Sequence, residues 1–159
     1  MHITNINDIV VDTNVFMHAN NDKIKFCKSS KEFIGYLSNC NILLCLDDGF
    51  DPVQSKNQSH IAHEYFTHIR HGEFAYGILL KILSSKNYKI IKKSQYKKYK
   101  KLVNQCIRNT FDRIFICIAI VSDSKLFISN DFEDLDLQKR KYLEKSIKNL
   151  RILSSAQLC

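Results

Sequence analysis

Short apolar runs alternate along the chain with longer segments whose apolar residues recur at helical spacing. The short runs are aliphatic or β-branched and are bounded by polar or turn residues, which is typical of buried strands. They predict strands over residues 9–12, 42–47, 126–129 and 150–153. Helices are predicted over residues 29–40, 96–109, 112–122 and 133–148, with a pair of helices covering roughly residues 60–86.

The alternation of strands and helices predicts a parallel sheet wrapped by helices. We therefore expect an α/β fold, a three-layer α/β/α sandwich with a central, mostly parallel sheet. The chain has 159 residues, which fits a single domain over residues 1–159. Ligands of such sheets bind outside the carboxyl ends of the strands. Two of the predicted strand ends are acidic, because Asp12 closes one and Asp131 follows another.

The composition is that of a water-soluble globular protein, with 45% hydrophobic and 25% charged residues. The amino terminus lacks the features of a signal peptide, and the apolar run over residues 114–121 is too short to span a bilayer. The cysteines form no C-x-x-C pair and mostly lie in apolar stretches, which indicates reduced core residues. They are Cys27, Cys40, Cys45, Cys106, Cys117 and Cys159. We expect a cytoplasmic protein, neither exported nor inserted in a membrane.

The charge is strongly basic, with 24 Lys and Arg against 16 Asp and Glu, for a net charge of +8. Such a charge attracts polyanions, nucleic acid more than an anionic membrane, although an A/T-rich genome also enriches lysine. Lysines and tyrosines interleave over residues 86–101, a combination suited to phosphate contact and base stacking. A solvated helix face or a mobile loop explains this run equally well. The candidate nucleic-acid contacts are Lys92, Lys93, Lys97 and Lys98.

Four carboxylates carry the candidate chemistry: Asp12, Glu64, Asp112 and Asp131. Taken singly, each has an ordinary explanation as a helix cap, a first-turn charge or a solvated side chain. Together they place acids at two strand ends and on two helices of a basic protein. Mg²⁺ and Mn²⁺ prefer such oxygen ligands, whereas acids clustered without metal would repel one another and the phosphate backbone.

The ordered segments VVDTNVF, HEY, DRIFICIAI and LFISNDFEDL resemble the motifs of the PIN domain nucleases. The resemblance implies a PIN-like fold and Mg²⁺- or Mn²⁺-dependent hydrolysis of phosphodiester bonds. It implies that the four carboxylates bind the metal, with Asn14 and Ser129 as polar supports. The spacing after Asp131 departs from the family pattern, so Asp134 is expected to replace or assist it. The loop over residues 47–59 is also longer than in compact members.

The resemblance further implies an endoribonuclease, either a toxin with an antitoxin partner or a component of a defence system with a partner protein. A homodimer is also expected from it. Two alternatives stay open, a nuclease of this type that acts on DNA and a nonenzymatic nucleic-acid-binding domain of the same fold. Substrate choice depends on surface shape, which the sequence does not give.

Histidines surround the predicted helical acid Glu64, but the H-E-x-x-H motif of zinc proteases is absent. His60, Glu64, His68 and His71 are spaced so that an unbroken helix would carry them on one face. The histidines of this face would contact phosphate or bind a transition metal, or they would form a merely polar stripe.

Overall fold

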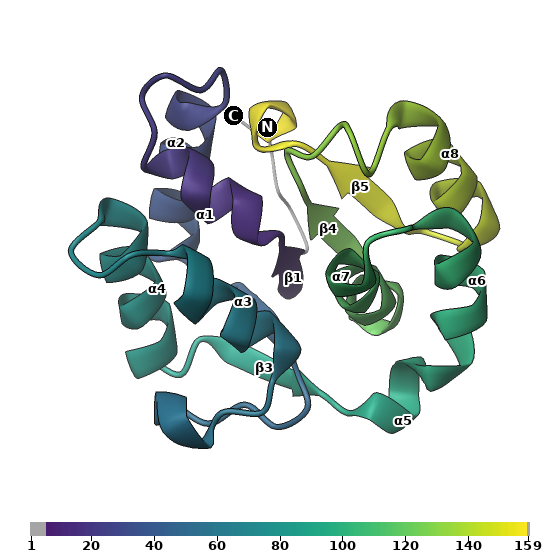
Figure 1. Cartoon of the computed structure of the whole chain (residues 1–159), viewed down its shortest axis with the longest axis horizontal. Coiled ribbons are helices and arrows are strands. Elements are labelled where there is room, and N and C mark those ends of the chain that lie inside the picture. The colour runs from purple at the N-terminus through teal and green to yellow at the C-terminus, as the bar shows by residue number, and fades with distance from the viewer. Residues whose placement is uncertain (1–5, 159) are drawn as a thin grey trace.

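The computed structural model describes residues 6–158, apart from the side chain of residue 111. Five parallel strands form one sheet in the order β3-β2-β1-β4-β5 (Figure 1). The strands are β1 (Asp8–Val11), β2 (Leu43–Asp47), β3 (Tyr88–Ile91), β4 (Leu126–Ile128) and β5 (Arg151–Leu153). The predicted parallel sheet is confirmed, and each predicted strand appears with bounds that differ by no more than one residue at either end.

Helices cover both faces of the sheet, with α1 to α4 on one side and α5 to α8 on the other (Figure 1). They are α1 (Thr13–Ala19), α2 (Cys27–Leu37), α3 (His60–His68), α4 (Phe74–Ser84), α5 (Lys93–Tyr96), α6 (Lys100–Cys106), α7 (Thr110–Val121) and α8 (Leu137–Ser146). Single 3₁₀ turns lie at η1 (Gln54–Lys56), η2 (Lys97–Tyr99) and η3 (Ser155–Gln157). The predicted three-layer α/β/α class is therefore confirmed.

The core lies on both faces of β1, which has no exposed residue. Strands that are covered on both faces need apolar side chains on both, which explains the continuous run Ile9, Val10 and Val11. Helix α7 packs across β1, β2 and β4 through a stretch that includes the buried Phe115 and Ile118. This packing fixes the position of the first turn of α7, where one candidate carboxylate lies.

Four parts of the fold differ from the sequence prediction. Strand β3 was not predicted, because it is an edge strand whose apolar residues alternate with Lys89 within a lysine-rich run. The helix predicted over residues 96–109 is wrong as a continuous element, since the chain forms α5, η2 and α6 instead. Helix α1 is an additional short helix, and α8 begins at Leu137 rather than at residue 133 because Asp136 caps it.

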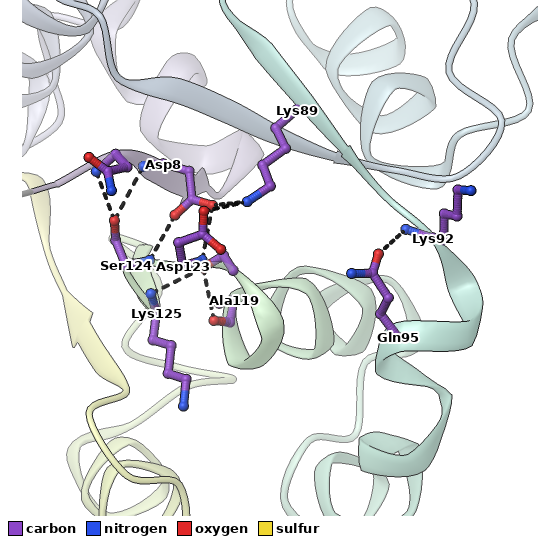
Figure 2. A network of polar contacts seen from close by, with 10 residues as sticks. Asp8, Lys89, Lys92, Gln95, Ala119, Asp123, Ser124 and Lys125 are labelled. Atoms are coloured by element: carbon purple, nitrogen blue, oxygen red, sulfur yellow. Dashed lines mark hydrogen bonds and ion pairs between the residues drawn. The ribbon is translucent and has the colours of Figure 1, made fainter.

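The amino end of β1 carries a buried carboxylate that has its own cation (Figure 2). Asp8 accepts hydrogen bonds from Lys89 Nζ at 2.9 Å and from the amides of Asp123 at 3.0 Å and Ser124 at 2.8 Å. Burial alone would raise the pKa of Asp8, but these donors bring the pKa below its ordinary value. The charge at this edge of the sheet is therefore neutralised within the chain.

The cysteines within the described residues carry free thiols. Cys27, Cys45 and Cys117 are buried, whereas Cys40 and Cys106 are half-buried. Cys159 lies outside the described residues.

None of the helices in residues 6–158 combines the length and the apolar character needed to cross a membrane.

Candidate metal centre

The candidate centre lies where the order of strands in the sheet reverses. From β1 the chain runs outward to β2 and β3 on one side, whereas β4 and β5 lie on the other. Crevices at the carboxyl ends of strands flanking such a point are the usual ligand sites of open α/β sheets. Asp12 follows β1 and Ser129 follows β4, and the Asp12 amide donates to the Ile128 carbonyl at 2.8 Å. The two strand ends are thus held side by side.

Asp12 is fixed by two neighbouring side chains. Its Oδ2 accepts hydrogen bonds from Ser129 Oγ at 2.6 Å and from Asn14 Nδ2 at 2.8 Å. Its Oδ1 accepts from the Asn14 amide at 3.4 Å, which makes Asp12 the N-cap of α1. Asp12 as a whole residue is only 8% exposed. Asp12 therefore caps helix α1 and is also close to other carboxylates. The interpretation of Asp12 as a helix cap and its interpretation as a site residue do not exclude each other.

Three further carboxylates meet near Asp12. Asp112 lies in the first turn of α7, and Asp131 and Asp134 lie in the loop after β4. Each offers a ligand oxygen, and the three oxygens lie within 4.8 Å of one another. The structure thus brings both Asp131 and Asp134 to the same place, whereas the sequence left the choice between them open.

Burial and neighbouring negative charges raise the pKa values of two of these carboxyls, Asp112 and Asp12. Burial raises the pKa of Asp112 to about 7, helped by the negative charges of Asp12, Asp131, Asp134 and Glu64. Burial and the charge of Asp131 raise the pKa of Asp12 to about 6, although its hydrogen bonds oppose the shift. Asp8 at the other end of β1 pairs with Lys89, whereas the ion pairs of residues 6–158 include none of Asp12, Asp112, Asp131 and Asp134. The buried Arg140 is a positive charge that acts on Asp131 and Asp12 without forming an ion pair with either.

Glu64 approaches this group from α3. Its charge contributes to the raised pKa of Asp112, and its side chain is 16% exposed. His68, one turn later, places Nε2 at 3.4 Å from a Glu64 carboxylate oxygen. The Tyr65 hydroxyl donates to the Val11 carbonyl and so anchors α3 to the end of β1. The four acids predicted from the sequence therefore converge on one edge of the sheet.

The loop that carries Asp131 and Asp134 is held from beneath by a buried arginine. Arg140 is 3% exposed, and its guanidinium donates to the carbonyls of Leu135 at 2.8 Å, Ser129 at 3.1 Å and Asp131 at 2.5 Å. The same group lies 4.2 Å from the centre of the Phe132 ring. Arg140 was not predicted as a site residue, because it lies among charged residues of a helix and no local pattern distinguishes it.

Asn130 is a second residue that the sequence did not single out. Its backbone amide donates to Asn14 Oδ1 at 3.0 Å, which connects the loop after β4 to Asn14, the residue that also donates to Asp12. Its side chain is buried and contacts Ser30 at 2.9 Å and the Ser155 amide at 2.9 Å. Its position between Ser129 and Asp131 is the signal that would have identified it.

The expectation that four residues share one helical face is wrong at His71. Helix α3 ends at His68, where the chain turns extended at Ile69 with φ −96° and ψ 110°. His71 instead packs against Tyr76, with ring centres 4.2 Å apart. His60 lies at the exposed start of α3. Only His68 touches a candidate carboxylate among the three histidines.

The predicted lysine contacts lie around the short helices after β3. Lys92 precedes α5, Lys93 begins it, and Lys97 and Lys98 form part of η2. All four side chains are exposed. Their contact with nucleic acid stays a prediction.

The donor set fits a hard divalent cation. Asp112, Asp131 and Asp134 present carboxylate oxygens within reach of one another, with no thiol or imidazole in that group. Mg²⁺ and Mn²⁺ favour such ligands, whereas zinc and copper sites are rich in nitrogen or sulfur. Burial is the main cause of the raised pKa of Asp112, and a cation there would also offset the neighbouring negative charges that add to it.

We expect Asp112→Asn to stabilise the chelator-treated protein at pH 8 by roughly 1 kcal/mol, because it removes a repelled buried charge. In the wild type, the folded pKa of Asp112 is about 7 and the ordinary value is 3.8. The folded state thus binds more protons in this window, and wild-type stability falls as pH rises from about 4 to about 7. The gain from Asn should therefore vanish near pH 4.

Urea unfolding at a series of pH values with chelator measures this difference. Asp123→Asn is the matched control, because its carboxylate pairs with Lys89 at 2.7 Å and its removal should give no gain. If Asp112→Asn is less stable than the wild type at pH 8, the buried charge of Asp112 does not destabilise the folded chain.

No family model matches the chain, and no curated protein matches it. One similar solved structure is the crystal structure of VapBC2 from Rickettsia felis bound to a DNA fragment from their promoter. The matching chain is 14% identical, the match covers 92% of this chain and 98% of that chain, and the TM-score is 0.48. A likeness this distant supports no inference about activity or partners. The fold and site define the protein as an α/β sandwich with a cluster of carboxylates at the point where the order of strands in its sheet reverses.

Proposed function

We propose that the protein is a metal-dependent nuclease of the PIN type that hydrolyses phosphodiester bonds, with RNA as the preferred substrate. In this proposal residues 1–159 form one nuclease domain. The observation that carries it is the meeting of Asp112, Asp131 and Asp134 within 4.8 Å. The order of motifs along the sequence, which resembles that of PIN nucleases, supports the same conclusion.

In the proposed site Asp112, Asp131 and Asp134 would hold Mg²⁺ or Mn²⁺, with Asp12 and Glu64 beside them. Such a cation, when bound, supplies a nucleophilic water at neutral pH and neutralises charge that develops on the phosphate. The chain contributes orientation. Ser129 and Asn14 donate to the same oxygen of Asp12, which prevents this carboxylate from rotating.

The positive net charge of the chain also supports a polyanionic substrate. A net charge of +8 draws nucleic acid toward the protein, while the acids alone would repel a phosphate. Cation and basic surface together would make the site accessible to the backbone. For the biological role, the resemblance supports a toxin paired with an antitoxin, or a defence component with a partner protein. We include a homodimer in the proposal on the same basis.

The test compares cleavage of labelled RNA, single-stranded DNA and duplex DNA with Mg²⁺, with Mn²⁺ and with chelator. We expect metal-dependent RNA cleavage that chelator abolishes and added metal restores. Asp131→Asn combined with Asp134→Asn should lower the rate at least about a hundredfold. Glu133→Gln, an exposed acid in the same loop, is the matched control and should cleave like the wild type.

Cleavage of DNA alone would replace RNA by the DNA-directed alternative. Binding of nucleic acid without cleavage under any metal would support the nonenzymatic alternative. Equal cleavage by the double variant and the wild type would refute the proposed centre.

A further inference from the structure

A cavity of about 340 Å³ lies between α3, α6 and α7. Thr110 and Arg113 of its lining flank Asp112 in the first turns of α7, and His60 lies one turn before Glu64 on α3. Lys100 and Asn104 line it from α6. Its volume falls in the range of about 300–1,000 Å³ that is usual for ligand sites. The carboxylates of the proposed centre do not line the cavity, but neighbours of Asp112 along α7 and of Glu64 along α3 do.

The polar lining of this cavity is cationic. Arg113 is held in place, since Nε donates to the Ile107 carbonyl at 2.8 Å and a terminal nitrogen donates to the Arg108 carbonyl at 3.0 Å. Lys100 lies 5.9 Å from the centre of the Tyr96 ring. Among the ion pairs of residues 6–158, none engages Lys100 or Arg113. Two positive groups thus face the cavity without an acidic partner.

A second cavity of about 390 Å³ lies next to the first, because both are lined by His60, Lys100 and Ile114. It adds Lys93 of α5 as a further cation.

Two acids also line the second cavity. Asp47 is already engaged, since its carboxylate accepts from the Ser59 hydroxyl and from the amides of His60 and Ile61. Asp48 is the other, and its Oδ2 lies 3.5 Å from the Lys93 amide. The first cavity, lined by Lys100 and Arg113, is therefore the more favourable place for an anion.

We propose that the first cavity binds one nucleotide of a single-stranded RNA, with its phosphate at Lys100 and Arg113. Ile114 offers an apolar surface for the face of a base, and the imidazole-bearing His60 lies on the same lining. Lys93 is placed to meet a neighbouring phosphate. The inference rests on the proposed nuclease function for the identity of the strand. Of the four lysines predicted from the sequence, Lys92, Lys93, Lys97 and Lys98, the inference uses Lys93 and adds Lys100 and Arg113.

The experiment measures binding of a fluorescein-labelled single-stranded RNA by anisotropy, with chelator present so that cleavage does not interfere. Lys100→Gln combined with Arg113→Gln should weaken binding about tenfold or more. The slope of log K against log salt should flatten by about 0.7, because the two side chains together neutralise one phosphate. Lys28→Gln combined with Lys145→Gln is the control, since it removes the same charge from exposed positions that line neither cavity.

Equal weakening by the test and control pairs would overturn the proposal, because it would show a general charge effect. Displacement of the strand by inorganic phosphate as complete as that by unlabelled RNA would also overturn it. Lys100→Gln alone, with about half the change in slope, keeps the test valid if Arg113→Gln does not fold. Because metal is absent, loss of binding is measured separately from cleavage: intact binding with no cleavage would refute the nuclease function and leave the cavity assigned.

Discussion

Asp12→Asn is expected to lower metal-dependent RNA cleavage by roughly a thousandfold or more while leaving the fold intact. Asn keeps the size of the side chain and an oxygen that accepts from Ser129, and it remains a good N-cap for α1. What it removes is the negative charge at the point where Asp112 and Asp131 converge. The loss therefore reports on charge rather than on structure.

Two measurements complete this prediction. Circular dichroism should give an unchanged spectrum, and the rise in melting temperature caused by Mn²⁺ in the wild type should shrink in the variant. Asp123→Asn makes the same chemical change at the opposite edge of the sheet and should retain full cleavage. If Asp12→Asn and the wild type cleave RNA alike, the nuclease activity does not reside in this centre.

Arg140→Met should lower the free energy of unfolding by about 3 kcal/mol, the second large effect that the structure predicts. The guanidinium is the donor for the carbonyls of Leu135, Ser129 and Asp131. Met fills a similar volume but leaves these oxygens without that donor in a buried place. The loop that presents Asp131 to the centre should also loosen, so cleavage should fall even at temperatures where the variant is folded.

Lys141→Met, at the exposed neighbouring position of α8, is the matched control and should change stability by less than about 0.5 kcal/mol. Urea unfolding at pH 7 measures both variants. An Arg140→Met protein as stable as the wild type would mean that the loop keeps its shape without the arginine.

The sequence predicted those parts of the fold that have a local cause. Strands β1 and β4 are covered on both faces, so they are continuous apolar runs that stand out from their surroundings. The edge strand β3 was missed because Lys89 interrupts it and polar residues follow. The end of α3 at His68 was missed because the apolar spacing continues to Ile69, which is buried although it is no longer helical.

The site was predictable to the extent that each acid follows a recognisable element. The joint placement of Asp131 and Asp134 depends on a loop in which Asp131 Oδ1 accepts from the amides of Glu133 at 2.8 Å and Asp134 at 3.0 Å. This turn brings two acids together that are three positions apart. The role of Arg140 depends wholly on tertiary contacts, which no local spacing records.

The two ends of β1 differ in a way that links the protein to its surroundings. At one end Lys89 forms an ion pair with the buried Asp8, so folding of the chain alone neutralises the charge of this carboxylate. At the other end Asp12 and its neighbours depend on a cation from solution in the proposed function, and binding of that ion would add to the stability of the folded chain. The lifetime of the protein in a cell would then follow the supply of divalent cation, and depletion of that ion would favour unfolding and proteolysis as well as inactivity.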